Sequence, residues 1–96
     1  MFPGSGAYHS SEIQFIFGNL KQEPPSPPEE IALSKAMQNT WGNFAKNPSA
    51  GPGWDKVGTN GGKDLGHFNY NGKLLVESSQ HLDRWCKYWA EGGYIK

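Results

Sequence analysis

The chain has 96 residues, of which 35% are hydrophobic, 14% aromatic and 19% charged. Its nine basic and nine acidic residues give a formal net charge of zero, so no general field attracts nucleic acid or an anionic membrane surface. No apolar run approaches the roughly 20 residues of a membrane-spanning helix, and the first residues lack the basic and apolar regions of a secretory signal. The single cysteine, Cys86, excludes an internal disulfide and does not indicate a compartment.

The length limits how much of the chain can be buried. A chain of this size forms at most one small domain and buries only about 60 to 70% of its unfolded surface, so we expect a thin core. The 14% of aromatic residues is nevertheless too high for a disordered tail.

The first predicted element is a helix between Ser10 and Leu20. Four apolar residues recur there at spacings of three and four, as on one face of a helix: Ile13, Ile16, Phe17 and Leu20. Ser10 or Ser11 could cap it. Residues 21–28 follow as a proline-rich loop, because consecutive prolines remove amide donors and restrict the residues before them.

The second predicted element is a longer helix that starts in the run Ser26-Pro27-Pro28-Glu29. A serine cap, proline in the first turn and glutamate three residues after the cap are together typical of a helix start. An apolar stripe then continues at spacings of four, four and three: Leu33, Met37, Trp41 and Phe44. Asn47-Pro48 predicts the end of this helix.

The third part is a loop followed by a short hairpin. Residues 49–66 are rich in Gly, Asn, Pro and Lys, which predicts an exposed loop with Trp54 as its one large anchor. Residues 68–70 and 73–76 flank Asn71-Gly72, a dipeptide that accepts positive φ at both positions and therefore favours a two-residue hairpin turn.

A last helix is predicted after a cap at Ser78 or Ser79, and Gly92-Gly93 should stop it. Its apolar face comprises Leu82, Trp85, Cys86 and Trp89. The helical spacing of the tryptophans favours core packing over a sugar- or peptide-binding surface. Because these amphipathic pieces have so little β-structure between them, the aromatic stripes would pack better against a larger sheet.

The stretch most informative about function is the run Gly6-Ala7-Tyr8-His9-Ser10-Ser11-Glu12, which leads into the aromatic residues 13–17 and closes on Phe17-Gly18. It resembles the histidine loop of type B carboxylesterases and cholinesterase-like lipases, Gly-x-x-His-(Gly or Ser)-x-Glu before an amphipathic helix. The resemblance continues more loosely over about the whole chain, including the hairpin, and is specific only over the first part. The residues that carry this looser resemblance are Pro28-Glu29-Glu30, Leu33-Ser34, Met37, the run 41–46 and Gly53-Trp54.

The resemblance implies a fold class and a domain assignment. Residues 1–96 would be a partial carboxylesterase type B domain, the C-terminal end of an α/β-hydrolase, with the proline-rich loop 21–28 inside it. Such a fragment is mostly helical, with about three helices and a short β-hairpin, and most of the sheet is missing.

The resemblance also implies a serine esterase mechanism, in which a hydroxyl attacks the ester carbonyl and a histidine removes its proton. His9 would be that catalytic histidine, and Gly6 would let the backbone bend before it. Glu12 would support the loop, since the acidic member of the triad precedes the histidine in α/β-hydrolases. No cofactor is implied, and an ester would be the substrate only in the full-length enzyme.

The chain lacks the nucleophile. It contains no Gly-x-Ser-x-Gly, and the nearest stretch, residues 47–51 around Ser49, lacks the first glycine, contains proline and follows a predicted helix instead of a strand. No oxyanion hole can be assigned. The sequence begins about where the last catalytic loop should begin, so we expect the isolated chain to be inactive.

Two other functions fit the composition. The chain could be a small non-catalytic protein-interaction module that uses the proline-rich run and exposed aromatics, or a degenerate remnant. His67 and His81 read as solvated residues, and three widely spaced histidines with one cysteine lack the spacing of a zinc site. Full-length relatives are often secreted, but neither the compartment nor the oligomeric state follows from this sequence.

Overall fold

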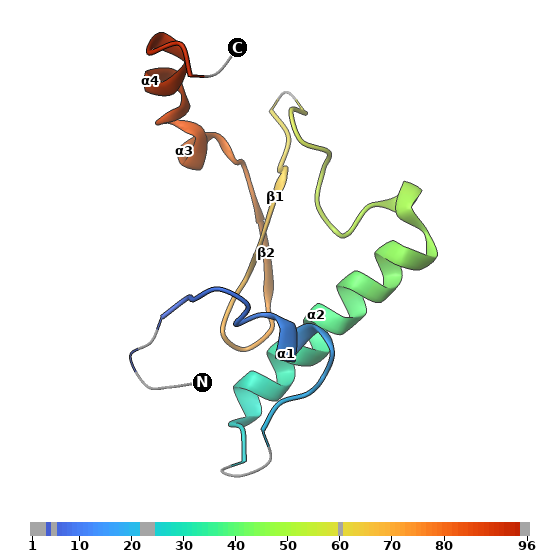
Figure 1. Ribbon diagram of the computed structural model, residues 1–96. Helices are drawn as coiled ribbons and strands as arrows, with labels where there is room; N and C mark the ends of the chain where they lie inside the picture. Colours follow the sequence, from blue (N-terminus) through green and yellow to red (C-terminus); the bar gives the residue numbers. More distant parts are fainter. Residues whose placement is uncertain (1–3, 5, 22–24, 60, 95–96) are drawn as a thin grey trace.

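The computed structural model describes residues 4, 6–21, 25–59 and 61–94. Its elements are α1 (Ile13–Ile16), α2 (Pro28–Lys46), the 3-10 turn η1 (Pro48–Ala50), β1 (Leu65–Phe68), β2 (Leu74–Glu77), α3 (Gln80–Asp83) and α4 (Cys86–Glu91). These helices and the single two-stranded hairpin confirm, for the described residues, the predicted mixture of about three helices and a short β-hairpin (Figure 1). Residues 22–24 of the predicted proline-rich loop lie outside the described residues.

The molecule is open and elongated. Its radius of gyration is 16.4 Å and its extents are 49 × 33 × 18 Å, whereas a compact domain of 100 residues has a radius of about 13 Å. Helices α3 and α4 form an arm that leads away from α2 and the hairpin (Figure 1). Among the described residues only Phe15 and Ser34 are buried, which confirms the thin core.

Helix α1 is shorter than predicted because positive φ angles flank it. Ser10 has φ 71° and Gly18 also has φ 71°, and neither conformation continues a right-handed helix. After α1, the Asn19 N–H donates to the Gln14 carbonyl at 2.8 Å and the Gly18 N–H to the Phe15 carbonyl at 3.3 Å. This pair of bonds is the Schellman motif, for which glycine supplies the left-handed residue.

Helix α2 runs 19 residues to Lys46 and ends before Asn47-Pro48, as predicted. The predicted serine cap is wrong. Pro27 occupies the cap position without a side-chain hydrogen bond, and the Ser26 hydroxyl instead donates to the Lys21 carbonyl at 3.3 Å. Pro28 fits the first helical position because that residue needs no amide donor.

The hairpin pairs β1 and β2 antiparallel, with Phe68 opposite Leu74 and Leu65 opposite Glu77. The predicted two-residue turn is wrong, because Asn71 does not have positive φ and only Gly72 does, at 82°. The Gly72 N–H donates to the Asn69 carbonyl at 2.9 Å, and the Asn69 N–H donates to the Lys73 carbonyl at 2.8 Å. The connection is therefore a three-residue loop, in which a tight turn is followed by one left-handed glycine.

Aromatic rings join the hairpin to α2 and to the loop before it. The Phe68 ring lies 6.1 Å from the Trp41 ring and 6.5 Å from the Trp54 ring, the latter in an edge-on arrangement. Trp54 packs directly over Gly66, where any side chain would collide with the indole. Trp54 is thus the loop anchor that the sequence predicted.

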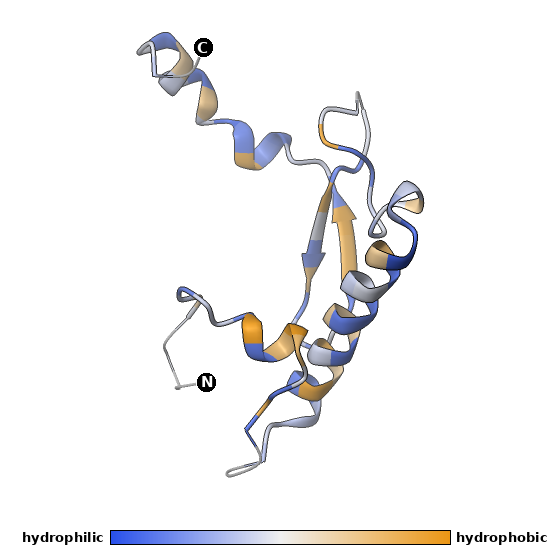
Figure 2. Ribbon diagram, turned by 45° about the vertical axis from the view of Figure 1, so that its right-hand side comes forward, coloured by the Kyte–Doolittle hydropathy of each residue, from blue (hydrophilic) through white to orange (hydrophobic). Residues whose placement is uncertain are grey.

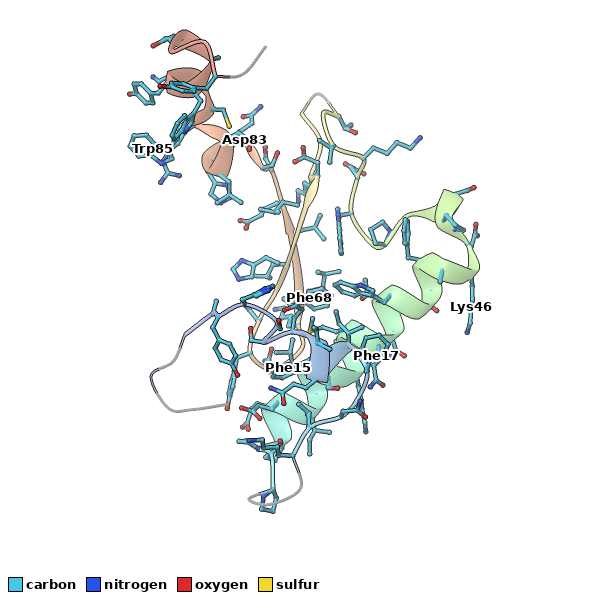
Figure 3. The ribbon with its side chains drawn as sticks, viewed as in Figure 1. Phe15, Phe17, Lys46, Phe68, Asp83 and Trp85 are labelled. Carbon is cyan, nitrogen blue, oxygen red and sulfur yellow. The ribbon has the colours of Figure 1, made fainter. Side chains whose placement is uncertain are left out.

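The predicted last helix is divided into α3 and α4 at Arg84-Trp85. The Arg84 guanidinium donates to the His81 carbonyl, the acceptor that the Trp85 N–H would use in a continuous helix. The Trp85 and Tyr88 rings lie 5.7 Å apart, yet Trp85 and Trp89 are 56% and 57% exposed. The core packing predicted for these two tryptophans is therefore absent from the described chain, and Figure 3 shows Trp85 on the outlying arm.

Candidate active site

The loop that carries His9 is a tight turn at the start of α1. The Ser11 N–H donates to the Tyr8 carbonyl at 3.1 Å, and the Ile13 N–H donates to the Ser10 carbonyl at 3.2 Å. His9 is exposed on this turn. Gly6, three residues earlier, has φ 63°, a backbone conformation that suits glycine. The loop therefore presents the imidazole to solvent from a chain that bends sharply.

Ser10 directly follows His9 and is the only non-glycine residue with positive φ in the described part of the chain. Left-handed conformations cost an ordinary L-residue about 1 to 2 kcal/mol, and strain of this kind concentrates at functional sites. Sequence reasoning missed this feature. The available signal was that the family motif accepts either glycine or serine at this place.

Replacing Ser10 with glycine is expected to raise the free energy of unfolding by about 0.5 kcal/mol, since glycine adopts the required φ without strain. The matched control is Ser11→Gly, at a neighbour without positive φ. That change should lower the free energy of unfolding by about 0.5 to 1 kcal/mol. Urea titration of both variants measures the difference, and a loss of stability in Ser10→Gly contradicts the strain at this position.

Glu12 lies where the loop meets α1. Its carbonyl accepts the N–H groups of Phe15 and Ile16, both at 3.0 Å, so its backbone starts the helix. Within the described residues its exposed carboxylate makes no hydrogen bond or ion pair. Glu12 can therefore support the histidine loop through its main chain.

Helix α1 is tied to α2 by the only two buried side chains of the described chain. Phe15 and Ser34 are each 4% exposed, and the Ser34 hydroxyl donates to the Phe15 carbonyl at 2.7 Å. Figure 3 shows Phe15 at the junction of the two helices. Sequence reasoning gave Ser34 no role, although a serine next to Leu33 on an apolar helix face was a signal.

The other candidate groups are not assembled around His9. Ser49 lies exposed in η1, after a helix, and so is not at the strand-to-helix turn of a nucleophile. His67 Nδ1 lies 3.5 Å from Glu77 Oε1, and His81 Nδ1 lies 2.9 Å from the Ser78 carbonyl. Where the chain is described, no group of three His, Cys, Asp or Glu side chains could hold a metal ion.

A polar joint connects the hairpin to the arm at Asp64. Its carboxylate accepts the Ser79 N–H at 2.8 Å, the Ser79 hydroxyl at 2.9 Å and the Gly58 N–H at 3.3 Å. These donors, the Ser79 N–H most of all, favour the charged form and lower the pKa of Asp64 from its ordinary value of 3.8, against a smaller opposing effect of burial.

Because the folded pKa of Asp64 lies below the unfolded one, its contribution to stability is present above about pH 4 and is lost as the pH falls through the folded pKa. We expect Asp64→Asn to destabilise the chain at pH 7 and to remove this part of the acid dependence. Ser79→Ala keeps the backbone donor and should remove only part of it. Urea titrations between pH 2 and pH 7, roughly the window of carboxylate titration, measure the loss; equal pH profiles for wild type and Asp64→Asn contradict it.

Comparisons with known proteins agree with the motif. The chain is 39% identical over 58 residues to secreted lipase 5 of Gibberella zeae, covering 57% of this chain and 11% of the lipase. It is 44% identical over 55 residues to carboxylesterase 4A of Bos taurus, covering 53% of this chain and 10% of that enzyme. It is 38% identical over 71 residues to acetylcholinesterase of Gallus gallus, covering 67% of this chain and 9% of that enzyme.

No protein-family profile matches the chain, and no solved structure does. The chain spans about a tenth of the length of the curated relatives it matches. Over the matched stretches it is a carboxylesterase-like and cholinesterase-like segment, which confirms the resemblance predicted from the histidine loop. Among the described residues no helix is long and apolar enough to cross a membrane.

Proposed function

We propose that this chain is the C-terminal portion of a carboxylic ester hydrolase of the α/β-hydrolase fold and supplies its catalytic histidine, His9. One observation carries the proposal: the histidine of a carboxylesterase-type loop lies exposed on a strained turn, in a chain whose matched relatives include a lipase and esterases. A base must be accessible to a hydroxyl from another part of the enzyme, and an exposed turn before a helix allows that.

In this mechanism the His9 imidazole accepts the proton of a serine hydroxyl as the hydroxyl attacks the ester carbonyl. The same imidazole then donates the proton to the leaving alcohol. Gly6 supplies the bend before the loop, and the Glu12 backbone begins the supporting helix. The serine, the acid and the oxyanion donors would come from the rest of the hydrolase, and the chemistry requires no cofactor.

The uncovered apolar surface supports packing against a larger body. Phe17 is 71% exposed, and a hollow of about 230 Å³ opens at the C-terminal end of α2. The residues that line this hollow are Thr40, Trp41, Phe44, Pro52 and Trp54. Figure 2 shows apolar segments, coloured orange, on α1 and on the hairpin. Many exposed large apolar side chains and an apolar hollow are typical of a surface that packs against a partner.

A chimera tests the proposal. We expect the isolated chain not to hydrolyse a short-chain nitrophenyl ester, since its sequence contains no Gly-x-Ser-x-Gly nucleophile motif. When this chain replaces the segment that it matches in secreted lipase 5 of Gibberella zeae, we expect turnover. The same lipase without that segment is the control. A soluble, folded chimera that is as inactive as this control contradicts the proposal.

The second candidate function is a non-catalytic interaction module. The exposed aromatic side chains of the arm favour it, with Trp85, Tyr88 and Trp89 each more than half exposed, and so do the exposed prolines Pro27 and Pro28. The chimera experiment distinguishes the two candidate functions, because an interaction module would not restore ester hydrolysis.

A further inference from the structure

We propose that Ser34 is a positioning residue that holds the His9 loop in place by fastening α1 to α2. This inference rests on the proposed function of His9. Its structural basis is the 2.7 Å hydrogen bond from the Ser34 hydroxyl to the Phe15 carbonyl, between two residues that are each 4% exposed. Ser34 lies 19 residues from Phe15 in the chain, so the bond joins two separate elements.

Helix α1 cannot hold the loop by itself. It has four residues, and an isolated helix of that length is unstable because the first turn fixes several residues for one hydrogen bond. Its N-terminal end directly follows the turn at His9, and Glu12, the N-cap residue, makes no capping hydrogen bond with its side chain. The rigidity of the loop must therefore come from contacts of α1 with α2, where Phe15 is the buried anchor.

The Ser34 hydroxyl is not used as helical serines usually are. A serine inside a helix commonly returns its hydroxyl to the carbonyl four residues earlier, which here belongs to Glu30. Instead the hydroxyl reaches the Phe15 carbonyl, which also accepts the Gly18 N–H at 3.3 Å. One carbonyl thus joins the C-terminal turn of α1 to the second turn of α2. A shift of this carbonyl would move α1 and the turn that presents His9.

The first stage of the test uses the isolated chain and needs no catalysis. In Ser34→Ala we expect the Ile16 and Phe17 amides, which close α1, to exchange with solvent about fivefold to tenfold faster, the effect of losing about one hydrogen bond. The matched control is Thr40→Ala, which removes a hydroxyl farther along the same helix. It should leave α1 exchange unchanged. Unchanged exchange in Ser34→Ala overturns the proposal.

The second stage uses the esterase chimera. We expect Ser34→Ala to lower kcat by about 10- to 100-fold, because a misplaced base loses the reacting geometry, and to leave KM within about twofold, because ester binding does not use this bond. Ser34→Thr, which retains the hydroxyl, should recover part of kcat. An unchanged kcat in Ser34→Ala overturns the positioning role. If the unsubstituted chimera is inactive, the proposed catalytic role of His9 is contradicted. The amide-exchange measurement of the first stage still decides whether Ser34 fixes α1.

Discussion

Replacing His9 with alanine is expected to lower kcat of the esterase chimera by about 10⁴- to 10⁶-fold, the loss that follows removal of a triad base. Without the imidazole the serine hydroxyl keeps its proton during attack, and no acid remains to protonate the leaving alcohol. The measurement is turnover of a short-chain nitrophenyl ester at pH 7 to 8, approximately the range in which a histidine base operates. His9 is exposed and lies in a turn, so the variant should fold as the parent does.

Two histidines of the same chain are the matched controls for this result. His67→Ala and His81→Ala remove exposed imidazoles from the hairpin and the arm, and we expect kcat in each to stay within about threefold of the parent, as for surface groups outside a site. Ester hydrolysis that survives His9→Ala, or an equal loss in the controls, removes His9 from the mechanism.

Replacing Gly72 with alanine is expected to lower the free energy of unfolding by about 2 to 4 kcal/mol, from left-handed strain and overpacking combined. Gly72 has φ 82° in the hairpin loop, and an added Cβ would lie 2.6 Å from the Ala32 carbonyl oxygen and 2.9 Å from its carbon. These are backbone atoms of α2, so no side-chain rotation can relieve the collision. The hairpin must move away from α2, and urea titration should show a lower midpoint.

The control for this substitution is Gly42→Ala. Gly42 lies inside α2, has no positive φ, and nothing lies within 4 Å of an added Cβ. The alanine should raise the free energy of unfolding by about 0.5 to 1 kcal/mol, since alanine favours the helix over glycine. The opposite signs distinguish the effect of the close packing of the hairpin loop from the general effect of replacing a glycine with alanine. Equal effects at both positions would contradict the close approach of the loop to α2.

Local chemistry predicted where the elements lie. Asn47-Pro48 ends α2 at Lys46 because proline disfavours helical conformation at the residue before it, and the apolar residues of 13–17 lie on a helix. The same local patterns predicted a cap at Ser26 and a two-residue turn at Asn71-Gly72, both wrong. In each case several local hydrogen-bonding arrangements satisfy the same residues, and contacts farther along the chain select one of them.

The candidate site likewise has features that follow from local sequence and features that depend on packing. The loop of His9 and its place before a helix follow from residues 6–18 alone, and the comparisons confirm a carboxylesterase-like segment over the stretches that they match. The bond from Ser34 to Phe15, the joint of Asp64 with Ser79 and the seating of Gly72 on α2 all connect residues distant in sequence. Spacing does not encode such contacts, because they depend on how the elements pack.

For this protein the sequence by itself determined the order of the main elements and the C-terminal end of α2 at Lys46, and it predicted His9 as the base. Only the tertiary structure decided that Ser10 is strained, that α1 is fastened by one buried hydroxyl, and that the two tryptophans of the arm are more than half exposed. The physical reason is the distance along the chain over which each kind of interaction acts. Turn and helix preferences act over a few neighbouring residues, whereas burial and strain depend on surfaces brought together from across the chain.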